Sequence, residues 1–89
     1  MSQQIENLAA SMGVSTADVA CLTQSIANSI SADKIAGVFT ESSEKTQVEL
    51  VQAYAIEANR KMESFSSRYL TNPDAQEGFR QSVRASLAA

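Results

Sequence analysis

The sequence predicts an all-α protein, a small bundle of four to five helices with one long helix over about residues 44–70. Apolar residues recur at spacings of three and four, the periodicity of an amphipathic helix. Residues that favour helix starts precede several of these segments. With 89 residues and a hydrophobic fraction of 44%, much of it alanine, the chain suits one closely packed domain over residues 1–89.

The first helix is expected between Ser2 and Gly13. Ser2 is a residue type that caps helices, and Ile5, Leu8 and Met12 share one helical face. Gly13 ends the pattern, because glycine readily adopts the backbone conformation that closes a helix. A short amphipathic helix is therefore predicted at the start.

A second helix is expected after Ser15. Asp18 follows Ser15 by three positions, the arrangement of a capping box variant, and its charge suits the positive end of the helix dipole. The helix then presents one apolar stripe toward the rest of the bundle, which identifies it as a surface helix. This stripe consists of Val19, Leu22, Ile26 and Ile30.

A short third helix is predicted after Ser31, which is placed to cap it. Ile35, Val38 and Phe39 would face the same side of this segment. Gly37 argues against a long helix here, and the polar residues 40–43 predict a turn.

The long helix is expected because residues 44–70 contain neither glycine nor proline. Apolar residues alternate there in steps of three and four over three heptads. This heptad stripe suits either packing inside the bundle or association with a partner or a second copy, and a helix of this length would extend about 40 Å. The candidate partner-binding residues are Val48, Val51, Ala55, Ala58, Met62, Phe65 and Tyr69.

The last helix has the clearest start in the chain. Asn72 is placed as an N-cap, and Pro73 occupies the first helical position, where its missing N–H costs nothing. Phe79 and Val83 then continue an apolar face. The expected core of the whole bundle consists of Leu8, Met12, Val19, Leu22, Ile26, Val38, Phe39, Val51, Ala55, Met62, Phe65, Phe79 and Val83.

Residues 5–24 resemble a helix-turn-helix motif. Ala9 is small where two helices would cross, Gly13 would make the turn, and Val14, Val19 and Leu22 would anchor the second helix. The resemblance implies a recognition helix that contacts DNA, although the acid near its start would repel phosphates. Its possible recognition residues are Ser15, Thr16, Asp18 and Thr23.

Charge is distributed unevenly, since the net charge is −3 and no lysine or arginine precedes Lys34. The cations of the last third suggest a basic patch for an acidic partner or for nucleic acid. The simpler interpretation is pairing on the surface with interleaved glutamates such as Glu77. The candidate patch consists of Arg60, Lys61, Arg68, Arg80 and Arg84.

The chain contains no histidine, and its three glycines stand far apart. We therefore expect no catalytic, cofactor-binding or metal-binding residues, no cofactor and no small-molecule substrate. The sequence predicts a non-enzymatic protein-interaction module, such as an adaptor, inhibitor or small assembly subunit. Its partner would be another protein or a second copy, and a small dimeric DNA-binding regulator is the alternative.

The apolar residues never form a run of about 18, so no membrane contact is expected. A lone Cys21 suits a reducing compartment better than a disulfide scaffold. The expected location is therefore the cytoplasm.

Overall fold

The computed structural model describes residues 3–58 and 69–88, and its described elements are all helices. This confirms the all-α class and the expected bundle. None of the described helices is both long and apolar enough to cross a membrane. The helices are α1 (Gln3–Met12), α2 (Thr16–Ala32), α3 (Ala36–Glu41), α4 (Glu44–Ala58) and α6 (Pro73–Ala88).

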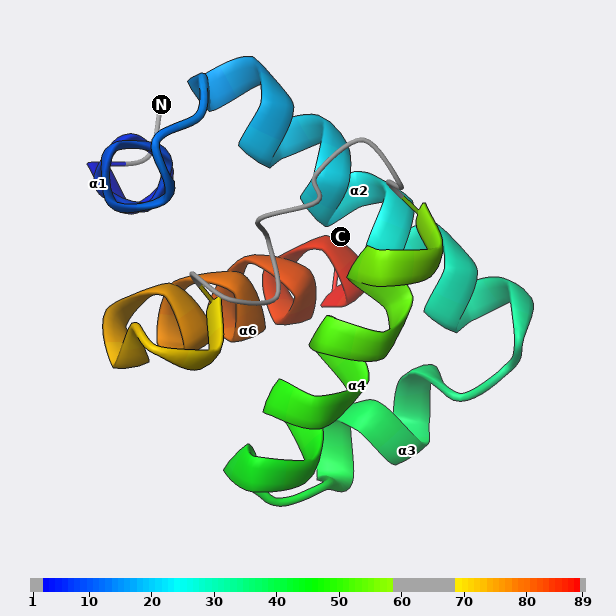
Figure 1. Ribbon diagram of the computed structural model, residues 1–89. Coiled ribbons are helices and arrows are strands. Elements are labelled where there is room, and N and C mark those ends of the chain that lie inside the picture. Colours follow the sequence, from blue (N-terminus) through cyan, green and yellow to red (C-terminus); the bar gives the residue numbers. More distant parts are fainter. Residues whose placement is uncertain (1–2, 59–68, 89) are drawn as a thin grey trace.

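Helices α2 and α6 make most of the contacts in the described bundle. Helix α2 contacts α1, α3, α4 and α6, and α6 contacts α1, α2 and α4. Figure 1 shows α1 beside the first turns of α6, and α2 passing above the end of α6. The last helix of the chain therefore packs against three of the earlier ones.

The corner between α1 and α2 forms as the sequence predicts. Gly13 has a positive φ of 68°, and it donates its backbone N–H to Ala10 while Val14 donates to Ala9. These two bonds are the Schellman arrangement that closes a helix. The Ser15 hydroxyl then accepts a hydrogen bond of 3.1 Å from the backbone N–H of Asp18, as an N-cap does.

Helix α2 ends later than predicted, because Ser31 lies inside it and does not cap α3. Lys34 follows the helix with a positive φ of 61°. It donates its backbone N–H to Ser31, and Ile35 donates to Ile30, so a lysine stands where glycine is usual. No side chain caps α3, whose first flanking residue is Ile35.

The prediction of one continuous helix over residues 44–70 is wrong. The Tyr69 hydroxyl donates a hydrogen bond of 3.0 Å to the backbone oxygen of Val48. In one helix, 21 positions would place these residues about 30 Å apart. The chain therefore brings Tyr69 back against α4, and Tyr69 also meets Phe79 edge to face, with ring centroids 6.0 Å apart.

The start of α6 confirms the predicted Asn72 cap. The side-chain oxygen of Asn72 accepts hydrogen bonds from the backbone N–H groups of Asp74 and Ala75, at 3.1 and 3.2 Å. Gln76 reaches back and donates to the backbone oxygen of Tyr69 at 3.1 Å. These contacts fix where α6 begins and how Tyr69 enters the core.

The core contains most of the predicted residues, but Val38 is a wrong prediction because it is 60% exposed. Met62 and Phe65 lie outside the described residues. Tyr69 and several small residues are buried in addition. The confirmed core residues are Leu8, Met12, Val19, Leu22, Ile26, Phe39, Val51, Ala55, Phe79 and Val83.

Thr23 carries the one buried side-chain oxygen without a hydrogen-bond partner among the described residues. Replacing Thr23 by valine keeps the side-chain shape and removes that unsatisfied hydroxyl. We expect Thr23→Val to raise the free energy of unfolding by about 1 kcal/mol, measured by urea denaturation. A destabilised variant would show that the hydroxyl has a partner in solution.

Candidate functional site

The heptad stripe faces the interior wherever the structure describes it. Val51, Ala55 and Tyr69 are at most 2% exposed, and Val48 is half-buried. Val51, Ala55 and Tyr69 therefore stabilise the bundle and offer no free surface to a partner. Val48 is partly exposed and lines a groove along α4. Of the other predicted contact residues, Met62 and Phe65 lie outside the described residues, as does the side chain of Ala58.

The predicted basic patch is not assembled within the described residues. Arg80 is only 5% exposed, so it is not a surface cation, whereas Arg84 is exposed. Arg60, Lys61 and Arg68 lie outside the described residues.

Arg80 instead belongs to a buried polar network that joins three helices. Its guanidinium donates to the Gln47 side-chain oxygen at 2.9 Å and to both carboxylate oxygens of Glu77 at 2.5 and 2.7 Å. The Gln47 amide nitrogen donates to the backbone oxygen of Phe39 at 2.7 Å. The network thus connects the end of α3 to α4 and α6. The Arg80–Glu77 pair agrees with the sequence interpretation of cations paired with interleaved glutamates, whereas the link to Gln47 was not predicted.

The hydrogen bond from Arg80 lowers the pKa of Glu77 below its ordinary value of 4.5, and a hydrogen bond from Gln81 adds to this. The carboxylate therefore stabilises the fold above the pH at which an unfolded glutamate titrates. This contribution is lost as the pH falls through the lower folded-state pKa.

We accordingly expect the melting temperature to fall as the pH drops below 4.5, and we expect Glu77→Gln to make that fall less steep. Calorimetry of both proteins between neutral and acidic pH measures the difference. Two parallel curves would show that Glu77 contributes nothing to acid sensitivity.

The predicted recognition residues are divided between surface and interior. Ser15, Thr16 and Asp18 are exposed at the start of α2, but Thr23 is buried and cannot reach a base edge. The sequence of α2 contains no lysine or arginine, and an exposed acid at its start opposes binding to phosphates. DNA binding remains a prediction from the sequence pattern.

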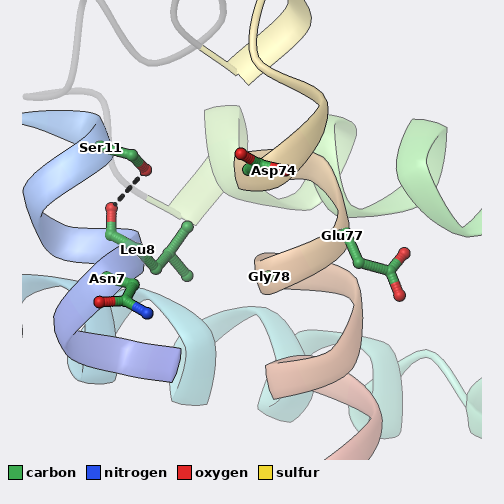
Figure 2. A pocket seen from close by; sticks show the side chains of 6 residues that line it. All are labelled: Asn7, Leu8, Ser11, Asp74, Glu77 and Gly78. Atoms are coloured by element: carbon green, nitrogen blue, oxygen red, sulfur yellow. Dashed lines mark hydrogen bonds between the residues drawn. The ribbon is translucent and has the colours of Figure 1, made fainter. Parts of the chain in front are cut away.

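A first groove lies between α1 and the start of α6, with a volume of about 570 Å³. Figure 2 shows Leu8 pointing across it toward Gly78, and the Ser11 hydroxyl donating to the backbone oxygen of Leu8 at 2.9 Å. A methyl group at Gly78 would lie 3.1 Å from Leu8, so glycine lets the two helices approach closely here.

This α1–α6 groove offers little unused chemistry. Glu77 points away from α1 in Figure 2 and is bound to Arg80, and Asp74 lies at the start of α6, where its charge suits the helix dipole. Its walls are therefore explained by helix packing and helix stability.

A second groove, the α3–α6 groove, has a volume of about 500 Å³ and a different lining. Most of its residues are small or apolar, and Arg84 is the single charged one. Gly37 has no atom within 4 Å of the position that a Cβ would occupy, so this part of the groove is open. The groove is lined by Ala36, Gly37, Thr40, Gln81, Arg84, Ala85, Leu87 and Ala88.

Arg84 is exposed at this groove, and within the described part of the chain no hydrogen bond or ion pair holds its guanidinium. Its charge helps to lower the pKa of Glu77, as a lesser cause after the hydrogen bonds. A guanidinium with five donors beside an apolar groove can bind a carboxylate while the groove receives apolar side chains.

Neither models of protein families nor curated proteins nor solved structures give a match to the chain. No group of three or more potential metal ligands occurs among the described residues.

Proposed function

We propose that the chain is a non-enzymatic protein-interaction module that binds an α-helix of a partner protein in the α3–α6 groove. The observation that carries the proposal is the combination of a small, apolar lining with one exposed arginine. The proposed contact surface is therefore the α3–α6 groove and not the heptad stripe predicted from the sequence, whose described residues are mostly buried.

The lining suits a helix because Ala36, Gly37 and Ala85 have little or no side chain. Helices pack about 8–10 Å apart, at distances that the contacting side chains determine, so small residues admit a close approach. Recognition of an amphipathic helix by an apolar groove is a common mode of peptide binding. Arg84 at the groove would fix the orientation of the bound helix through a charge-assisted hydrogen bond.

The exposed and unpaired thiol of Cys21 favours a reducing compartment. We therefore expect the module to act in the cytoplasm, as an adaptor, inhibitor or small assembly subunit.

Ala85→Arg tests the groove directly, because Ala85 is exposed and a large side chain there would fill the binding surface. Immobilised wild-type chain and variant would be compared for the proteins they retain from cells that express the chain, with quantification by mass spectrometry. We expect at least one protein, further copies of the chain included, to be retained about tenfold less by the variant.

Ala20→Arg is the matched control, since it places the same side chain at an exposed position of α2 away from the groove. It should retain the same proteins as the wild type. Equal retention by all three proteins, with circular dichroism showing them folded, would contradict the assignment of the groove.

A further inference from the structure

The outward face of α4 has no partner within the described structure. It combines exposed acidic residues with an exposed apolar side chain, as helices that bind grooves do. Glu49, Ala53, Ile56 and Glu57 are all exposed, at spacings of three and four that place them on one side of the helix. Ile56 is 50% exposed, and among the described large apolar residues Val38 and Leu70 are exposed to a similar degree. The opposite side of α4 carries the buried Val51 and Ala55.

This α4 face complements the α3–α6 groove in charge and in size. The face carries two carboxylates and the exposed Ile56, with the exposed Lys45 one turn before Glu49. The groove has one exposed guanidinium and a mostly small or apolar lining. A carboxylate of Glu49 or Glu57 would give Arg84 the partner that it lacks within the described residues. Ile56 would meet alanine and glycine across the same contact.

We infer that the helix bound in the α3–α6 groove is α4 of a second copy of this chain. The inference rests on the proposed function, and it names the occupant of the same groove. Within one copy, α4 uses its inner side to contact α2, α3 and α6, and none of the described helices occupies its outward face. Two copies related by a two-fold axis would exchange the contact reciprocally.

The first experiment is light scattering coupled to size exclusion, at chain concentrations up to about 1 mM, which covers weak association. The wild type is expected to show a mass that rises with concentration toward that of a dimer. Arg84→Glu places a negative charge against the acidic face, and a variant with both Glu49→Lys and Glu57→Lys places positive charge against Arg84. Each is expected to weaken self-association at least about tenfold.

Mixing the two variants is the decisive step. In the mixture, Glu at position 84 of one copy meets lysines of the other, and the native Arg84 meets native glutamates, so both reciprocal contacts regain attraction. The single exposed Cys21 allows one copy to carry a fluorescence donor and the other an acceptor. We expect energy transfer in the mixture, and markedly less, at the same concentration, when either labelled variant is mixed with itself.

A wild-type chain that stays monomeric over the whole concentration range overturns the inference, as does a mixture without energy transfer. All substituted residues are exposed, so an unchanged melting temperature would confirm that the variants are folded. The proposed function has a separate outcome. If the chain is monomeric but Ala85→Arg fails to retain some other protein that the wild type retains, the groove binds a partner. Only the second copy as occupant is then excluded.

Discussion

Replacing Phe79 by alanine is expected to lower the free energy of unfolding by about 3–5 kcal/mol. Phe79 is fully buried on α6, the helix that α1, α2 and α4 all contact. Its ring also meets Tyr69 at an interplanar angle of 71°, an edge contact that adds to the loss. Since small domains are stable by only about 5–15 kcal/mol, this loss would remove a large fraction of the total stability. Urea denaturation followed by circular dichroism measures the effect.

The control for this experiment is Val38→Ala, because Val38 is 60% exposed. Its free energy of unfolding should change by less than about 0.5 kcal/mol. A loss below about 1 kcal/mol at Phe79 would show that its ring contributes little to the packed core.

The second large effect is expected at Gln47, which links Arg80 to the end of α3. Gln47→Leu fills the same volume but removes the acceptor for the Arg80 guanidinium and the donor to the Phe39 backbone oxygen. Hydrogen bonds to charged groups contribute more than neutral ones, so we expect a loss of about 2 kcal/mol. Denaturant titration of the variant measures it.

Gln52→Leu makes the same change on a less buried part of α4, and it should be nearly neutral. If both variants lose the same stability, the buried network contributes nothing beyond the propensity of the helix.

Helix starts could be predicted from the sequence because their signals are local. Ser15 and Asn72 both cap helices through side-chain oxygens that bond to backbone N–H groups two or three positions later. Gly13 likewise closes α1 with its own backbone conformation. These capping features depend on a few neighbouring residues, so the sequence alone is enough to predict them.

The end of α2 could not be predicted, because Lys34 adopts there a conformation that glycine usually supplies. The return of Tyr69 to α4 was hidden for a different reason. An apolar residue every three or four positions is compatible with one long helix and also with a chain that returns Tyr69 to Val48. Only contacts distant in sequence distinguish the two.

The α3–α6 groove could not be predicted from the sequence, because its lining residues give little pattern. Ala36, Gly37 and Ala85 are small, and small residues form no apolar stripe that marks a binding surface. Arg80 and Arg84 look alike in the sequence, yet one is buried in a network and the other is exposed at the groove. The distinction arises from α4, which packs against α6 from far earlier in the chain and places Gln47 beside Arg80.

Photocrosslinking from Gly37 tests the central claim most directly, because a side chain at this position would project into open space within the groove. A photoreactive residue would be placed there, with a second protein carrying it at the exposed Ala20 as control. The proposed function predicts a discrete protein adduct from position 37 and none from position 20, and the dimer predicts that this adduct contains α4 of a second copy. No adduct from position 37, or equal adducts from both positions, would contradict the groove as a binding surface.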